Sequence, residues 1–150
     1  MDLTLLHMKQ RYFSEILIPR LIDAGIKRRF GVVVVEVARS PIQAQWNANH
    51  CATCKEAEED HIPDDAHLFT PIGISRSLHI LRLAIDLALF KIVSADEVKY
   101  LTESESYEPL GVWWEDQSAK YRGIEIECCW GGRFRRPDGG HFSVAHEGRR

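Results

Sequence analysis

The sequence predicts an α+β fold in which helices pack on one face of a small, largely antiparallel sheet. Apolar residues recur at helical spacing near the N-terminus, a β-branched run (GVVVVEVAR) follows, and the C-terminal part alternates short apolar pieces with Gly and Pro. The chain has 150 residues, of which 45% are apolar and 27% charged. These values suit one soluble domain over residues 1–150, with no separate second domain.

The first third of the chain predicts a helix and then a strand. Residues 3–29 read as an amphipathic helix. Pro19 can kink it or split it into two shorter helices, and Gly25 is the expected stop. Residues 31–39 read as a buried strand, after which residues 41–49 can form a short helix.

The rest of the chain predicts an irregular segment and several further strands. Residues 48–73 are rich in His, Cys, Asp, Glu and Pro, and a loop of this length in a small domain is usually functional or held by a ligand. Residues 83–92 read as a second strand, and residues 93–103 as a turn followed by a strand. Residues 107–120 read as a short helix, and residues 125–148 as strands with tight turns.

Charge and hydropathy exclude some classes of partner. A net charge of -3 argues against a dedicated nucleic-acid binder. The longest apolar run is too short to span a bilayer, so we expect no stable membrane association. The first residues lack the cationic and apolar regions of a signal peptide, so we expect synthesis in a cytoplasm.

Two segments carry residues able to bind a metal, residues 77–86 and residues 130–142. On a straight helix His79 and Asp86 would lie about 10.5 Å apart along the axis, and on a straight strand they would point to opposite faces. Zinc ligands lie roughly 2 Å from the ion. Shared ligation therefore requires the chain to turn between the two residues, around Leu81 and Arg82.

His141 offers a third ligand from a distant part of the chain, which leaves a fourth position for water. Bound zinc lowers the pKa of water from about 15.7 to about 7, and a base must then accept a proton. Asp138 lies three residues before His141, inside a Pro-Gly-Gly turn that can bring its carboxylate near that water. Spacing alone also allows ordinary histidines and a simple turn aspartate.

Four segments in order resemble one family of proteins. The segment SLHILRLAID resembles the central pattern Ser-x-His…Ala-x-Asp of the zinc D-Ala-D-Ala carboxypeptidase and L-alanyl-D-glutamate endopeptidase family, in its phage endolysin branch. The segment WGGRF…DGGHFS resembles the closing pattern of that branch. The two remaining resemblances are VEVARSPIQA, residues 35–44, and YLTESESYEPLGVWW, residues 100–114.

The resemblance implies a fold of the D-Ala-D-Ala metallopeptidase or hedgehog type and hydrolysis of an amide bond in the peptidoglycan stem peptide. An Asp at position 138, where related carboxypeptidases use Glu, favours the endopeptidase. The implied roles are zinc binding by His79, Asp86 and His141, proton transfer by Asp138, polarisation of the scissile carbonyl by Arg39, and a hydrogen bond to substrate or a shaping role for Ser77.

Two other functions remain open beside the endopeptidase. One is a D,D-carboxypeptidase that removes terminal D-Ala, and the other is a non-catalytic binding module stabilised by metal. The resemblance to phage endolysins further implies a monomer that is made in the host cytoplasm. It would reach the cell wall in the periplasm through a holin-type pore.

A second zinc site is conceivable in the Cys-rich loop. Cys51 and Cys54 have the Cys-x-x-Cys spacing of a structural zinc knuckle. His50 or His61 could complete such a site, as could Cys128 or Cys129 if they fold nearby. The alternative is a pair of reduced thiols in a long loop.

Overall fold

A single helical rod forms the N-terminal part of the molecule. The computed structural model describes residues 2–38 and 77–150. The side chain of Asp2 caps the rod by accepting hydrogen bonds from the backbone N–H groups of Thr4 and Leu5. The predicted helix over residues 3–29 is confirmed, and it consists of three continuous pieces: α1 (Leu3–Tyr12), the π-helical turn η1 (Phe13–Leu17) and α2 (Ile18–Lys27).

Near Pro19 the rod consists of two shorter α-helices, as predicted, but the π-helical turn η1 joins them without a gap. The proline lies in the first turn of α2, and the wider turn η1 comes directly before it. The N–H of Ile18 donates to the carbonyl of Phe13, five residues earlier. A proline has no N–H and its ring collides with the carbonyl four residues earlier, and the π-helical turn accommodates both effects without breaking the helix.

Gly25 is not the helix stop that the sequence predicts. It is buried within α2, which ends at Lys27, and Arg29 adopts a left-handed conformation with φ 62°. A Cβ at position 25 would lie 2.7 Å from Cγ2 of Val32 in the following strand. The glycine therefore allows the helix to approach the sheet closely.

Among the described residues, the sheet has five strands, all paired antiparallel. Its order is β1-β2-β7-β6, and β3 pairs with the outer part of β2. The predicted strands over residues 31–39, 83–92 and 93–103 are confirmed in position, with small changes at their ends. The first of them is not the buried strand that the sequence predicts, because Val33, Val34 and Val35 are 42%, 45% and 64% exposed. The strands are β1 (Phe30–Glu36), β2 (Ala84–Ser94), β3 (Glu97–Tyr100), β6 (Cys128–Trp130) and β7 (His141–Val144).

The segment between β3 and β6 contains a helix that is shorter than expected. The predicted helix over residues 107–120 is replaced by a 3-10 turn η2 (Ser104–Tyr107) and by α6 (Glu108–Glu115). The last residues of the predicted helix instead form part of a two-stranded hairpin, in which residues 119–121 pair with residues 124–126. The hairpin consists of β4 (Ala119–Tyr121) and β5 (Ile124–Ile126), and a 3-10 turn η3 (Gly131–Arg133) follows β6.

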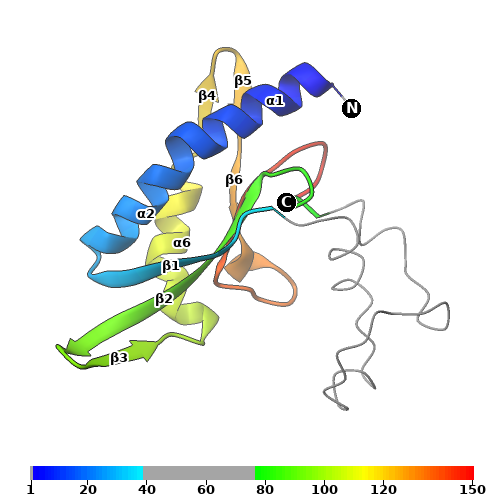
Figure 1. Ribbon diagram of the computed structural model, residues 1–150. Coiled ribbons are helices and arrows are strands. Elements are labelled where there is room, and N and C mark those ends of the chain that lie inside the picture. The colour runs from blue at the N-terminus through cyan, green and yellow to red at the C-terminus, as the bar shows by residue number, and fades with distance from the viewer. Residues whose placement is uncertain (1, 39–76) are drawn as a thin grey trace, which may run out of the picture.

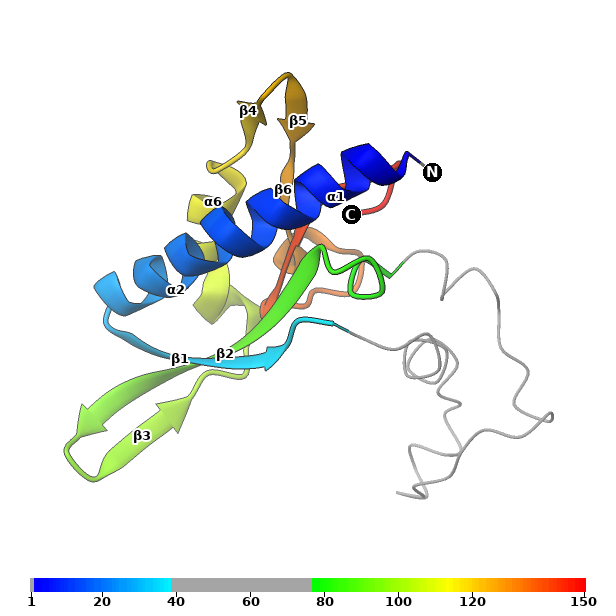
Figure 2. The ribbon, with the colours of Figure 1, turned by 45° about the horizontal axis from the view of Figure 1, so that its top comes forward.

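The hydrophobic core lies between the helices and one face of the sheet, which confirms the predicted α+β class. Figures 1 and 2 show the rod α1–α2 and helix α6 on the same side of the sheet. The ring of Trp114 in α6 makes edge contacts with Phe13 and with Phe142 of β7. Because side chains alternate along a strand, burying Phe142 directs its neighbour His141 to the opposite face. In the described parts of the chain, no helix is long and apolar enough to cross a bilayer.

Candidate metal centre and catalytic site

Strands β2 and β7 place two candidate ligands side by side. Asp86 and His141 are direct partners in the antiparallel register. Their neighbours Ile85, Leu87 and Phe142 are buried in the core, so both candidate ligands point away from it. Oδ1 of Asp86 lies 3.0 Å from Nδ1 of His141.

His79 joins this pair because the chain reverses just before β2. The N–H of Arg82 donates to the carbonyl of His79 at 3.1 Å, and the N–H of Leu83 donates to that of Leu78 at 2.9 Å. Arg82 adopts φ 54°, in the left-handed region. The turn that shared ligation requires around Leu81 and Arg82 is therefore present.

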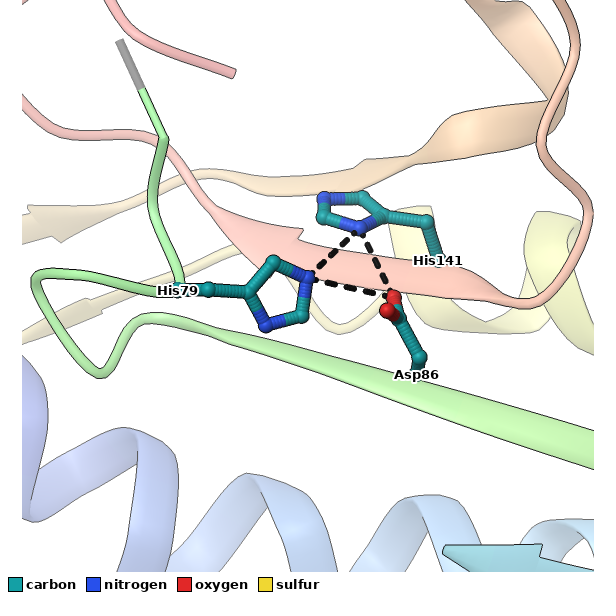
Figure 3. A group of neighbouring side chains, drawn as sticks. All are labelled: His79, Asp86 and His141. Atoms are coloured by element: carbon teal, nitrogen blue, oxygen red, sulfur yellow. Dashed lines mark hydrogen bonds and ion pairs between the residues drawn. The ribbon is translucent and has the colours of Figure 1, made fainter. Parts of the chain in front are cut away.

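The three candidate ligand atoms form a small triangle, which Figure 3 shows. Nε2 of His79 lies 3.2 Å from Oδ1 of Asp86 and 3.2 Å from Nδ1 of His141. Ligands about 2.0–2.1 Å from a tetrahedral zinc ion are about 3.3 Å from one another. The triangle thus has nearly the size that zinc requires, and within the described residues these three side chains are the one His/Cys/Asp/Glu group close enough to share an ion.

The site is enclosed and favours a charged carboxylate. The side chains of His79, His141 and Asp86 are 3%, 11% and 23% exposed. Burial raises the pKa of Asp86, but hydrogen bonds and charge interactions with His141 and His79 outweigh it and hold this pKa well below its usual range. An ionised carboxylate between two imidazoles is a donor set that suits zinc.

The second ring nitrogen of His79, Nδ1, is buried and has no hydrogen-bond partner among the described residues. Histidines that bind metals usually donate this other N–H to an oxygen atom, which holds the ring in place. His141 is instead supported by a ring contact, because Phe134 packs against it with the ring centroids 5.4 Å apart.

Asp138 lies beside the triangle without belonging to it. The N–H of His141 donates to the carbonyl of Asp138 at 3.2 Å, which closes a tight turn between the two residues. Asp138 is exposed, and it lines a cavity of about 300 Å³ that Asp86 also lines. Asp138 and one candidate ligand, Asp86, therefore line the same cavity, and the proton-transfer role of Asp138 stays a prediction.

Of the remaining predicted residues of the catalytic site and the Cys-rich loop, the structure describes only Ser77. Ser77 is half-buried two positions before His79, and it is not among the described residues that line the cavity. Arg39 lies outside the described residues, as do all four members of the Cys-rich loop, His50, Cys51, Cys54 and His61. Their predicted roles stay predictions.

Cys128 and Cys129 are described, but the Cys-rich loop whose zinc site either could complete is not, so that site stays a prediction. Both are buried in β6, and no metal-binding group of described residues contains them. Burial, as the largest effect, raises the pKa of the Cys128 thiol to about 12 and that of Cys129 to about 11. Zinc binds the thiolate form, which these surroundings disfavour.

The structure adds cavity residues to which the sequence assigned no role. Thr102, Ser104 and Tyr107 line the same space as Asp86 and Asp138. They lie within the segment 100–114, whose resemblance to the family implies no function for single residues. No local sequence pattern marks these three residues as part of the cavity, because they reach it only when η2 packs beside the turn at Asp138.

Comparison with known proteins agrees with this geometry. Residues 73–144 match the family described as D-alanyl-D-alanine carboxypeptidase. Over these residues the chain is similar to that family. The matched segment contains all three candidate ligands and Asp138, and it extends from just before the turn at His79 to the end of β7.

Other comparisons add little to the family match. No curated protein matches the chain. Among solved structures, the chain is similar to the L-Ala D-Glu endopeptidase ChiX of Serratia marcescens, with a TM-score of 0.47 and 18% sequence identity. That match covers 85% of this chain and 77% of the endopeptidase.

Proposed function

We propose that this protein is a zinc-dependent peptidase that hydrolyses an amide bond of the peptidoglycan stem peptide. One observation carries the proposal most directly. The ligand atoms of His79, Asp86 and His141 lie 3.0–3.2 Å from one another, and the cavity beside them is lined by a separate carboxylate, Asp138. A metal group with an independent acid–base residue is the arrangement of a metallopeptidase.

The residues have distinct tasks in this proposal. His79, Asp86 and His141 hold the ion, which when bound supplies Lewis acidity that activates water and polarises the scissile carbonyl. Asp138 accepts a proton from the attacking water and returns it to the leaving amine. Arg39 is proposed to stabilise the charge that develops on the carbonyl oxygen, and Ser77 to support the substrate or the shape of the site.

For the bond cleaved, we propose the one between L-Ala and D-Glu. The support is the aspartate at position 138, since the resemblance associates Asp at this place with the endopeptidase and Glu with carboxypeptidases. A D,D-carboxypeptidase is the second candidate, and the description of the matched family favours it. A non-catalytic binding module is less favoured, because such a module has no use for a carboxylate beside the metal group.

We further propose that the protein acts as a phage endolysin. It would be a monomer made in the host cytoplasm and would reach the peptidoglycan in the periplasm through a holin-type pore. The support is the resemblance of four segments to that branch. Expression with and without a holin-type pore in a Gram-negative host tests this, because lysis is expected only when both are present.

Product analysis tests the reaction itself. Purified peptidoglycan is digested by the zinc-loaded protein, and the released fragments are identified by mass spectrometry and by labelling of new amino groups. New N-terminal D-Glu indicates the proposed endopeptidase, whereas free D-Ala indicates the carboxypeptidase. Digestion by an Asp138→Asn variant is the matched control, and an absence of products from the wild-type protein contradicts both.

A further inference from the structure

The turn that carries Asp138 is held from two sides by side chains of other elements. The N–H of Gly139 donates to Oγ of Ser104 at 3.0 Å, and the carbonyl of Gly139 accepts a hydrogen bond from Nε1 of Trp130 at 2.9 Å. Gly139 is buried, and it is the residue directly after Asp138. Both hydrogen-bonding groups of this residue are therefore satisfied by side chains.

Backbone contacts limit the same turn further. The N–H of Asp138 donates to the carbonyl of Gly131 at 2.9 Å, and the carbonyl of Gly140 accepts from the N–H of Leu87 at 2.9 Å. A Cβ on Gly139 would lie 2.7 Å from Cα of Ser104. With so little room, the position of η2 determines where the turn can lie.

We propose that Ser104 is a positioning residue that sets the placement of the Asp138 carboxylate through the hydrogen bond to Gly139. Ser104 begins η2, lies 35 positions before Gly139 and lines the cavity together with Asp138. Of the two side chains bonded to Gly139, Trp130 leads into η3 and the turn itself, whereas Ser104 ties the turn to a separate element. Loss of the hydroxyl leaves a buried N–H without its partner and frees the turn to move.

This inference rests on the proposed function, because it assigns Ser104 a role in the proton transfer by Asp138. A displacement of a catalytic group by about 1 Å can lower a rate by up to about a hundredfold. The metal group should be unaffected, because His79, Asp86 and His141 are held by β2, β7 and the turn at Arg82. Ser104→Ala should therefore lower kcat and leave zinc affinity and KM near their wild-type values.

The test compares Ser104→Ala with Ser106→Ala, a serine of the same 3-10 turn that does not line the cavity. We expect Ser104→Ala to lower kcat about tenfold, with KM changed less than twofold and zinc binding by calorimetry unchanged. Hydrogen exchange of the Gly139 amide should become faster in this variant. Ser106→Ala should change none of these quantities.

A double-mutant cycle identifies the residue through which Ser104 acts. In an Asp138→Asn background, Ser104→Ala should lower the residual kcat less than twofold, because residues that act as a unit are not additive. A full tenfold loss in that background overturns the proposal, as does an unchanged kcat in the single variant. A wild-type protein that hydrolyses nothing overturns the proposed function and the role of Ser104 together.

Discussion

Nε2 of His79 lies 3.2 Å from Oδ1 of Asp86, although seven positions separate the two residues in the chain. The contact depends on the reversal at residues 78–82, where Arg82 adopts a left-handed backbone conformation. This turn, and not a helix or strand, brings the first candidate ligand to the other two. The metal centre is therefore sensitive to the backbone at Arg82.

Substitution of Arg82 tests this dependence. Arg82→Gly should preserve zinc affinity, because glycine adopts a positive φ without strain. Arg82→Val should lower the free energy of unfolding by about 1–3 kcal/mol and weaken zinc binding, because a β-branched residue strongly disfavours this conformation. Calorimetric zinc titration and denaturant unfolding measure the two effects, and equal zinc affinity in both variants would show that the turn does not control the site.

Removal of zinc should destabilise the fold as well as stop catalysis. Asp86 and His141 join β2 to β7, and His79 adds the preceding turn, so an ion held by all three links these segments. Zinc at about 100 times its dissociation constant should add about 2.7 kcal/mol to the free energy of unfolding. For a chain of this size, that corresponds to a rise in Tm of roughly 5–11 °C.

Thermal unfolding with added zinc and with a chelator measures this shift. His79→Ala is the matched control, since removing one ligand should abolish most of the rise in Tm. A wild-type Tm that is identical in zinc and in chelator would argue against a metal held by these residues.

Gly131 should be essential for the arrangement of the site. A Cβ at this position would lie 2.7 Å from Cβ of His141 and would collide with the backbone carbonyl of Asp138. Gly131→Ala should therefore cost about 1–3 kcal/mol of stability and should lower activity more than tenfold, because it moves both the base and a ligand.

Gly123→Ala supplies the comparison for that variant. Gly123 lies in the β4–β5 turn with φ 82°, and no other atom lies within 4 Å of the place that a Cβ would take, so alanine adds backbone strain far from the site. Activity per folded molecule should stay at the wild-type level in Gly123→Ala. If both glycine variants lose activity equally, general destabilisation is the cause and the close contact at Gly131 is not.

His146 should make the fold less stable in acid. It is 1% exposed, and neither ring nitrogen has a hydrogen-bond partner among the described residues. Burial is the largest effect and lowers its pKa; Glu147 opposes this, while Lys9 and Arg149 add to it. The unfolded chain therefore binds a proton more readily than the folded chain, so stability is complete above about pH 6.5 and falls as the pH drops toward the lowered folded-state pKa.

Denaturant unfolding between pH 7.5 and pH 5, with chelator present to exclude zinc release, measures this effect. His146→Leu should flatten the dependence on pH, since it removes the titrating group and fills a buried position with apolar atoms. The loss in acid should be about 1.4 kcal/mol for each tenfold difference in proton affinity between the two states. An equal dependence on pH in the wild-type protein and in His146→Leu would contradict this account.

The parts of this structure that could be predicted are those with a local signal. Apolar periodicity predicts the N-terminal rod and β2, and the spacing of His79 and Asp86 already demands the turn that the structure contains. Gly25 and the π-helical turn before Pro19 could not be predicted, because each depends on how the rod meets the sheet. The bond from Gly139 to Ser104 joins residues 35 positions apart, and only the packed structure places them together.

The central claim is that one group of residues holds zinc and another residue performs proton transfer. The most direct measurement is zinc stoichiometry and peptidoglycan hydrolysis on the same samples of the wild-type protein and of Asp138→Asn. We predict one zinc ion per chain in both, with hydrolysis lowered at least a hundredfold in the variant. Full hydrolysis by Asp138→Asn, or by zinc-free wild-type protein, would contradict the account.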